Sequence, residues 1–249
     1  TQPVYPDENG HYEGDVISDL TFARTQFTVQ VKSGSGSMKK EATVRKGYQA
    51  PEAPQRQEGR LSGVTVCIDA GHQENGRFVN EPIGPGLSGS TSGKGGMAQG
   101  TKTNRRESIV CLEIGMLLRD ELLRQGANVI MTREDQTTFH TNIERCEIAE
   151  AGGAQIMLRL HCNNSSNRSK RGIQVYGPLN SDYAKAVADA DTYREMGQKL
   201  LDAMKTRVGM TLANSTGMVR LNDNYVGNNW AQMMCFLVEM GYLSNPAEE

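Results

Sequence analysis

The strand-like run Val64-Thr-Val-Cys-Ile-Asp-Ala-Gly-His72 is apolar and ends in a glycine and a histidine. A second run of the same kind, Gln155-Ile-Met-Leu-Arg-Leu-His161, also ends in a histidine. Open α/β sheets collect their binding groups at the carboxyl ends of parallel strands. Because two of the four histidines of the chain stand at such ends, the sequence predicts that His72 and His161 lie at one rim of a sheet.

Strand-like and helix-like segments alternate along the rest of the chain, which indicates an α/β fold with a mostly parallel, twisted sheet flanked by helices. A helix is expected to begin at Glu107, because apolar residues recur at helical spacing from Val110 to Leu122 and Gly126 follows as a stop signal. One long helix is expected over residues 182–208. The other expected elements are strands at 64–68, 127–132, 155–160, 172–176 and 234–238 and a helix at 142–151.

The beginning of the chain differs from the rest and predicts a division near residue 60. Residues 1–48 contain Phe27-Thr-Val-Gln-Val-Lys and Ala42-Thr-Val-Arg around a Ser-Gly-Ser-Gly-Ser run, which favours a small hairpin, the last strands of a β module, or an irregular segment. Residues 49–60 contain two prolines and almost no apolar residues, as expected of a linker. The main domain is therefore expected over residues 61–249.

Composition limits the class of protein. A chain of 249 residues that is 37% hydrophobic can build one domain with a substantial core. Its 27 Lys and Arg against 29 Asp and Glu argue against nucleic acid as a partner. No apolar run approaches the length of a transmembrane segment, and the first residues do not form a signal-peptide pattern. The five cysteines lack CxxC spacing, and most are expected to be buried thiols.

Three side chains predict a metal site. Catalytic zinc sites use three protein ligands, mostly histidine or carboxylate, and leave a fourth position for water. His72, Glu107 and His161 supply such a set, but they are too far apart in the sequence for a local helix motif. Glu239 follows the apolar run Cys235-Phe-Leu-Val, where a carboxylate needs either a partner or a catalytic role.

Each of these residues also has a simpler interpretation. A single histidine at a strand end is more often structural than a ligand, and Glu107 can interact with its helix dipole for about 0.3–1 kcal/mol. Glu239 can instead form a buried ion pair with an arginine. The Gly-rich stretch at residues 84–100 is long enough to be a functional loop, but it lacks the Gly-Lys-Ser/Thr ending of a phosphate loop.

Four segments stand in a fixed order along the chain: Val66-Cys-Ile-Asp-Ala-Gly-His72, Glu107-Ser-Ile-Val-Cys-Leu-Glu-Ile, Leu158-Arg-Leu-His161-Cys-Asn163 and Phe236-Leu-Val-Glu239-Met-Gly-Tyr-Leu-Ser-Asn245-Pro. Together they resemble the zinc-dependent N-acetylmuramoyl-L-alanine amidases of bacterial cell-wall turnover, the amidase type 3 family. The first is similar to the strand that ends in the family's first histidine ligand, and the second to the helix that opens with its glutamate ligand. The third is similar to a Ser-x-His-x-Asn strand end, and the fourth to the segment of the catalytic glutamate.

The resemblance covers about residues 62–249 and implies that residues 61–249 form an amidase catalytic domain. The implied reaction is hydrolysis of the amide between N-acetylmuramic acid and the L-alanine of the peptidoglycan stem peptide. The implied site holds one Zn²⁺ on His72, Glu107 and His161, with Glu239 as base and then acid and Asn163 in contact with the substrate. We expect burial to raise the pKa of Glu239. Peptidoglycan or muropeptides as substrate imply an extracellular, cell-wall or periplasmic location.

The chain departs from the family at two places that carry no ligand. Gln73 and Glu74 stand where the family often has two glycines, and Ser108-Ile-Val-Cys replaces a leucine-rich helix start. The segment between His72 and Glu107 is longer than in compact members, which predicts a lid, a substrate-selecting loop or a docking site for a regulatory partner at residues 78–106. Two other functions stay open, namely a zinc peptidase that cuts within the stem peptide and a non-catalytic wall-binding or regulatory module.

Overall fold

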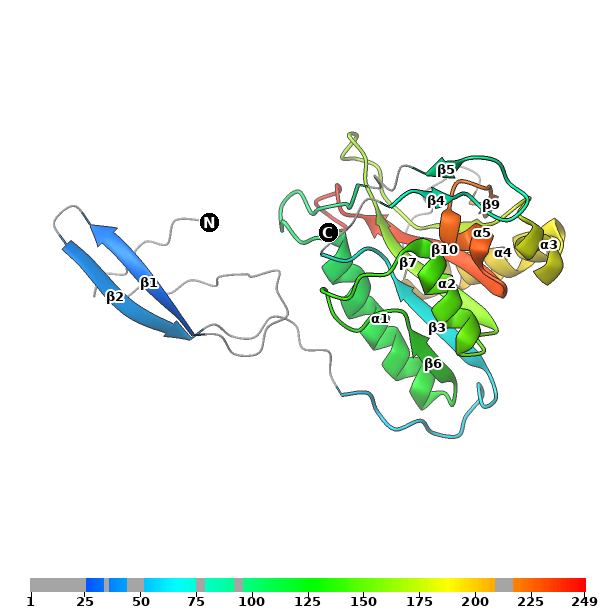
Figure 1. Cartoon of the computed structure of the whole chain (residues 1–249), viewed down its shortest axis with the longest axis horizontal. Coiled ribbons are helices and arrows are strands. Elements are labelled where there is room, and N and C mark those ends of the chain that lie inside the picture. Colours follow the sequence, from blue (N-terminus) through cyan, green and yellow to red (C-terminus); the bar gives the residue numbers. More distant parts are fainter. Residues whose placement is uncertain (1–25, 34–35, 44–51, 75–78, 92–95, 209–216) are drawn as a thin grey trace. The chain divides into compact units, whose positions relative to one another are not determined.

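The structure, a computed structural model, describes residues 26–33, 36–43, 52–74, 79–91, 96–208 and 217–249, and it divides into two compact units at Gln49 and Ala50. In the first unit, β1 (Gln26–Ser33) pairs antiparallel with β2 (Gly36–Thr43), from Gln26 opposite Thr43 to Ser33 opposite Gly36 (Figure 1). A hairpin was one of the expectations for this segment. The second strand begins earlier than Ala42, and residues 44 and 45 of the expected strand lie outside the described residues. The boundaries at residues 48 and 60 stay predictions.

The second unit contains a six-stranded sheet in the order β6-β3-β7-β10-β8-β9 (Figure 1). In this order β6, β3, β7 and β10 each run parallel to the next strand. Strand β8 is antiparallel to β10, and β9 is parallel to β8. The expected α/β fold with a mostly parallel sheet is therefore confirmed. The strands are β3 (Thr65–Ala70), β6 (Asn128–Met131), β7 (Ile156–Asn163), β8 (Gln174–Gly177), β9 (Arg220–Leu221) and β10 (Met234–Tyr242).

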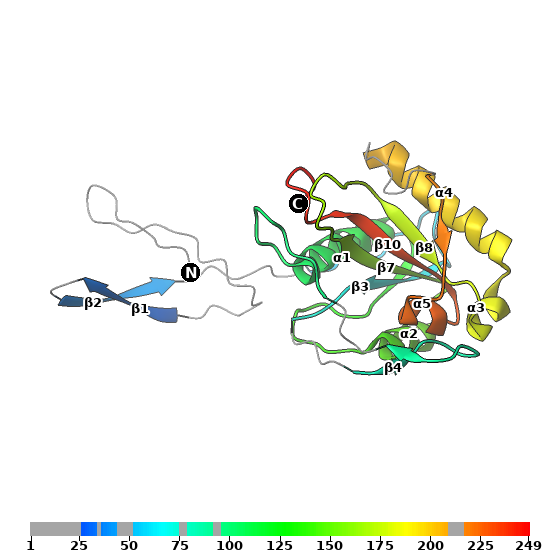
Figure 2. The same ribbon diagram turned by 90° about the horizontal axis from the view of Figure 1, so that it is seen from above.

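Helices cover both faces of this sheet, which explains why its central strands are apolar almost throughout (Figure 2). On one face, α1 (Glu107–Arg124) packs against β3, β6 and β7, and α4 (Ala190–Val208) packs against β8 and β9. On the other face, α2 (Asn142–Ala151) contacts α5 (Val226–Trp230), which in turn contacts β10 and α3 (Asp182–Val187).

Alternating strand residues supply two separate cores, because successive side chains of a strand point to opposite faces. The core beneath α1 and α4 includes Ile68, Leu160, Val175 and Phe236. The core on the α2 side contains three cysteines, Cys67, Cys146 and Cys235, together with Met157. All five cysteines of the chain are free and buried, which confirms the expectation of buried thiols.

The predicted long helix over residues 182–208 was wrong in one respect, since the chain forms two helices there. Ala188 has an extended backbone (φ −164°, ψ 162°) and ends α3. Asp189 Oδ1 then accepts a hydrogen bond of 2.7 Å from the Thr192 amide, which caps the start of α4. No helix among the described residues is both long and apolar enough to cross a bilayer.

Two strands extend further than the sequence predicted, and the extensions carry the chemically important side chains. Strand β7 continues beyond Leu160 to Asn163, and β10 continues beyond Val238 to Tyr242. His161 and Glu239 therefore lie within paired strands and are register partners. The described part of the segment between His72 and Glu107 includes a small hairpin of β4 (Glu81–Pro82) and β5 (Ser90–Thr91).

Candidate metal centre

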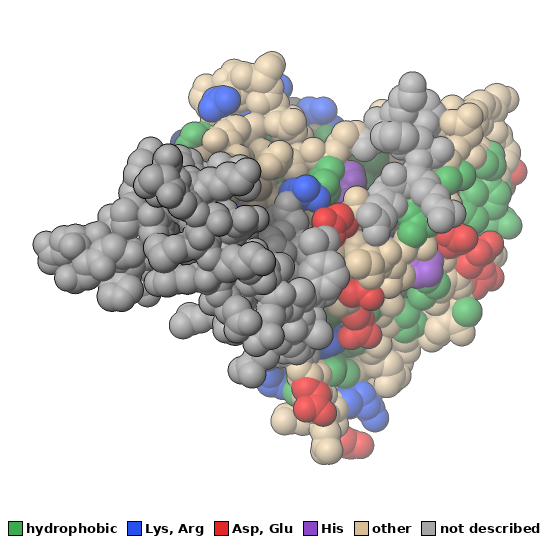
Figure 3. All heavy atoms as spheres, turned by 60° about the vertical axis from the view of Figure 1, so that its left-hand side comes forward, with side chains coloured by type: hydrophobic (Ala, Val, Ile, Leu, Met, Phe, Trp, Pro, Cys, Tyr) green, Lys and Arg blue, Asp and Glu red, His purple; other side chains and the backbone are tan. Residues whose placement is uncertain are grey.

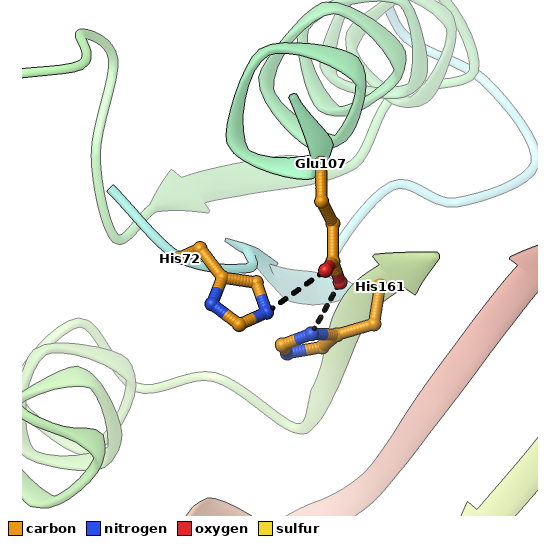
Figure 4. Close-up of side chains that lie close together, drawn as sticks. All are labelled: His72, Glu107 and His161. Atoms are coloured by element: carbon orange, nitrogen blue, oxygen red, sulfur yellow. Dashed lines mark hydrogen bonds and ion pairs between the residues drawn. The ribbon is translucent and has the colours of Figure 1, made fainter. Parts of the chain in front are cut away.

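His72, Glu107 and His161 meet at the carboxyl ends of β3 and β7 (Figure 4). Nε2 of His72 lies 3.1 Å from Oε2 of Glu107, and Nδ1 of His161 lies 3.0 Å from Oε1 of the same carboxylate. One potential ligand atom from each residue lies within 4.8 Å of the other two. The three residues that the sequence singled out are thus brought together from three separate elements.

Glu107 is held in place from both sides of its carboxylate. It is the first residue of α1, and its side chain is almost fully buried. Its Oε2 accepts a hydrogen bond of 2.8 Å from the Ala98 amide, and its Oε1 accepts one of 2.9 Å from the Cys162 amide. The loop before α1 and the end of β7 therefore fix the position of the carboxylate between the two imidazoles.

The turn after β3 brings His72 close to His161, and Gly71 makes this approach sterically feasible. A Cβ atom at Gly71 would lie 2.5 Å from the Leu160 carbonyl oxygen and 2.6 Å from Cε1 of His161. His72 itself has φ of +57°, a left-handed backbone that costs a non-glycine residue about 1–3 kcal/mol. Arg145 donates to the His72 carbonyl at 3.1 Å and so stabilises this conformation.

The protonation states in the site suit a cation. Burial opposes ionisation of Glu107, but hydrogen bonds from His161 and His72 outweigh it and hold the pKa of this carboxyl well below its ordinary value. Burial also lowers the pKa of His161. Metal ligands must be carboxylates and neutral imidazoles, and the lowered pKa values of Glu107 and His161 favour these forms.

The potential ligand atoms of this site can be compared with those of known types of zinc site. Two imidazole nitrogens and one carboxylate are the ligand types of catalytic zinc sites. Nε2 of His161 is buried and has no hydrogen-bond partner among the described residues. A buried polar atom without a partner is costly, which is consistent with a site shaped for a further group. The residues present therefore fit a zinc ion.

Glu239 lies beside this cluster on the same face of the sheet, because it is the register partner of His161. Its Oε2 is buried and has no hydrogen-bond partner among the described residues. Burial raises the pKa of the Glu239 carboxyl to about 8, and the nearby Glu107 carboxylate adds to the effect. No arginine or lysine of the described residues forms an ion pair with Glu239, so the ion-pair interpretation has no support.

A cavity of about 790 Å³ opens over the four residues. Asn163, the residue proposed to contact the substrate, lies on its wall. The wall also includes residues of the segment before α1, among them Glu81 and Ala98. The side chain of His72 is 23% exposed, and histidine side chains reach the surface beside acidic ones on the face shown in Figure 3.

Sequence reasoning missed a buried charged cluster at the cavity, where Arg145 and Arg159 form part of the wall. Asp69 is completely buried and accepts hydrogen bonds from Arg145, from Nε of Arg159 at 2.9 Å and from Thr132 at 2.7 Å. Burial opposes ionisation of Asp69, but the two arginines outweigh it and hold its pKa well below the ordinary value. The sequence did contain a signal for this cluster. Asp69 and Arg159 each lie inside an apolar run, and a buried charge needs a partner.

Comparison with known proteins agrees with this geometry. The model of the N-acetylmuramoyl-L-alanine amidase family matches residues 66–249. The chain belongs to this family. The family resemblance and the class of enzyme expected from the sequence, an amidase that acts on peptidoglycan, are therefore confirmed.

Two curated members of the amidase family illustrate the relationship. N-acetylmuramoyl-L-alanine amidase Rv3717 of Mycobacterium tuberculosis is 28% identical over 197 residues, which cover 76% of this chain and 77% of that protein. The probable cell wall amidase LytH of Staphylococcus aureus is 27% identical over 198 residues. That match covers 78% of this chain but 53% of LytH, so the chain spans about half the length of that relative.

Solved structures of N-acetylmuramyl-L-alanine amidases share the fold. The apo form of Ami1 from Mycobacterium abscessus superposes with a TM-score of 0.65 at 22% identity, covering 74% of this chain and 86% of Ami1. Ami1 from Mycobacterium smegmatis gives a TM-score of 0.63 at 18% identity, covering 75% and 86% of the two chains.

Proposed function

We propose that this protein is a zinc-dependent amidase that hydrolyses the bond between N-acetylmuramic acid and the L-alanine of the peptidoglycan stem peptide. His72, Glu107 and His161 would hold one Zn²⁺. The observation that carries the proposal is the meeting of two imidazoles and one buried carboxylate at a single point of the cavity. A zinc ion bound there supplies Lewis acidity and acidifies a water molecule.

Glu239 is the proposed catalytic base and then acid. Its unpartnered Oε2 accepts a proton from the attacking water, whose oxygen adds to the amide carbonyl carbon. The carbon–nitrogen bond breaks, and Glu239 returns the proton to the departing nitrogen of L-alanine. The raised pKa of Glu239 supports this role, because a group that titrates near neutral pH can take and return a proton at similar free-energy cost.

Asn163 is the proposed substrate contact. It ends β7 two residues after His161, and it lies on the cavity wall. Residues two apart in a strand point to the same face, so the Asn163 side chain lies on the face of the cluster. Its amide can donate a hydrogen bond to a sugar or peptide carbonyl oxygen.

The proposed location follows from the proposed substrate, which is peptidoglycan or its muropeptides. Peptidoglycan lies outside the cytoplasmic membrane, so we expect the protein to act in the extracellular space, the cell wall or the periplasm. The name of the staphylococcal relative, a probable cell wall amidase, supports this location.

The segment over residues 78–106 is the proposed docking site for a regulatory partner. It contributes Glu81, Thr91 and Met97 to the cavity wall, so a protein bound to it would act directly on substrate entry. The solved structure of the CwlD amidase from Clostridioides difficile is a complex with the GerS lipoprotein, which supports a protein partner for an amidase of this fold.

Metal analysis combined with product analysis tests the proposed reaction. We expect one zinc per chain and, from purified sacculi, intact stem peptides that begin with a free L-alanine amine. Glu239→Ala should abolish cleavage and retain zinc, whereas the exposed α1 variant Glu121→Gln should cleave normally. Peptides cut within the stem would instead indicate a zinc peptidase, and intact sacculi with wild-type enzyme would indicate a non-catalytic module.

A further inference from the structure

A row of side chains continues from the metal centre across the sheet. Leu237 of β10 is opposite Tyr176 of β8, and Tyr176 is opposite Arg220 of β9. Directly opposite residues point to the same face, and so do residues two apart in one strand. The side chains of Glu239, Leu237, Tyr176 and Arg220 therefore share one face.

The neighbours of Arg220 in the chain confirm its orientation. Val219 is buried in the core beneath α4, and Leu221 packs against the same core. A Cβ at Gly177, the register partner of Leu221, would lie 2.8 Å from Cδ2 of Leu221, so these two residues face that core together. Arg220 must then point to the opposite face, which is the face of Glu239.

The cavity extends from the metal centre in this direction. Leu237 and Glu239 form part of its wall, followed by Asn224, Tyr225 and Val226. The ring of Tyr225 lies on that of Tyr176, with ring centroids 4.9 Å apart. Tyr225 therefore lies between the cavity and Tyr176, the register partner of Arg220.

Arg220 is an exposed cation without a carboxylate partner among the described residues. The acidic residue nearest to it in the sequence, Asp223, is already engaged. Its Oδ1 accepts from the Leu179 and Asn180 amides at 3.2 and 2.7 Å, and its Oδ2 accepts from the Asn180 side chain at 2.7 Å. Arg220 also acts on the tyrosine pair, because its charge partly offsets the rise that burial causes in the pKa of Tyr176 and Tyr225. The guanidinium is thus available to an external anion.

A short bound peptide and the long side chain of Arg220 together can span the separation of β10 and β9. Two strand spacings of about 4.8 Å put β9 roughly 10 Å from β10. An extended peptide advances about 3.3–3.6 Å per residue, so the second stem residue lies roughly 7 Å beyond the scissile amide. Where the second stem residue is an acidic residue linked through its side chain, its α-carboxyl group stays free. A guanidinium binds such a carboxylate in a bidentate manner.

We propose that Arg220, beside the Tyr176–Tyr225 pair, binds the free α-carboxylate of the second stem residue and so makes the enzyme selective for stems that carry this charge. This inference rests on the proposed amidase reaction. It assigns to Arg220 a role in substrate selection and not in the chemical step.

Two muropeptides that differ only at this carboxylate test the proposal. One carries the free acid at the second residue and the other carries the primary amide. The wild-type enzyme should cleave the acid with a kcat/KM about tenfold higher than that for the amide, since a charge-assisted bidentate contact is lost. Arg220→Gln should lower kcat/KM for the acid by about tenfold and leave the amide almost unchanged. Arg220→Lys should keep part of the preference.

Arg207→Gln is the matched control, because Arg207 is exposed on α4 at the other face of the sheet. This variant should cleave both muropeptides with the same kcat/KM as the wild type. The role of Arg220 is wrong if the wild type cleaves both muropeptides but Arg220→Gln lowers kcat/KM equally for the two. It is also wrong if Arg220→Gln lowers kcat/KM for neither. If the wild type cleaves neither muropeptide at the L-alanine amide, the proposed function itself fails.

Discussion

Asp69 and Arg159 lie directly opposite each other in the neighbouring parallel strands β3 and β7, and Nε of Arg159 donates to Oδ2 of Asp69 at 2.9 Å. Each residue precedes a proposed zinc ligand by a few positions, since Asp69 is followed by His72 and Arg159 by His161. The ion pair therefore ties together the two strand ends that carry the imidazoles.

Replacing Asp69 should test how much the fold depends on this pair. Asp69→Asn leaves Arg145 and Arg159 buried with less compensation, so we expect a loss of about 3–5 kcal/mol in the free energy of unfolding. Urea denaturation measures it. The control Asp191→Asn changes a side chain that is 94% exposed and should alter stability by less than about 0.5 kcal/mol. A small effect of Asp69→Asn would show that the ion pair does not stabilise the fold.

The same residue predicts a pH dependence of stability. The pKa of Asp69 is lower in the folded protein than its ordinary value of 3.8. The stabilisation is therefore complete above about pH 5 and is lost as the pH falls through 3.8 and below. Unfolding free energies of wild type and Asp69→Asn, measured from pH 7 to pH 3, should converge towards low pH. Parallel curves would contradict the assignment.

Activity should show an acid limb from Glu239. The base must be deprotonated in the free enzyme, so kcat/KM should rise with pH through the pKa of this group. Burial raises that pKa from 4.5 to about 8, and a bound cation on the same face lowers it, so the limb should lie between these values. A kcat/KM profile that is flat from pH 4.5 to pH 8 would exclude Glu239 as the base.

Gly71 should be essential for metal binding. In Gly71→Ala the new methyl group meets the Leu160 carbonyl oxygen and the His161 ring, so the ring must move. We expect loss of zinc and at least a hundredfold loss of activity, measured by metal analysis and muropeptide release. Gly115→Ala on α1 is the control, because its nearest contact would be an ordinary 3.4 Å. Full zinc content in Gly71→Ala would show that the close approach is not required.

Removal of the metal should lower stability as well as activity. A ligand that binds the folded state alone stabilises it by about 2.7 kcal/mol at one hundred times its dissociation constant. Dialysis against a chelator should abolish cleavage and lower the melting temperature, and added Zn²⁺ should restore both. A melting temperature that is independent of zinc would contradict a site on His72, Glu107 and His161.

Most of the fold could be predicted from the sequence because its signals are local. The apolar runs of β3, β7 and β10 and the helical spacing of α1 are visible without knowledge of their neighbours. The break at Ala188 is not, since the residues around it suit a helix and the interruption depends on the cap at Asp189. The two-residue strand β9 and the single-turn helix α5 are too short to give a periodic signal.

The candidate site was also only partly predictable from the sequence. His72, Glu107, His161 and Glu239 were singled out from strand ends, a helix start and the family resemblance, but sequence spacing does not determine which side chains meet. Glu239 was expected just after a strand and lies inside one, because pairing with β7 continues through polar residues. The partnership of Asp69 with Arg159 could not be inferred without the register of β3 against β7.

The five buried thiols have a consequence for refolding. No disulfide joins any of them, so no cross-link between thiols stabilises the folded chain. An unfolded copy in an oxidising medium exposes all five at once, and any cross-link then formed is foreign to the native state and blocks its recovery. Thermal inactivation in air should therefore become irreversible unless a reductant is present, and a thiol-reactive dye should label the protein only as it opens.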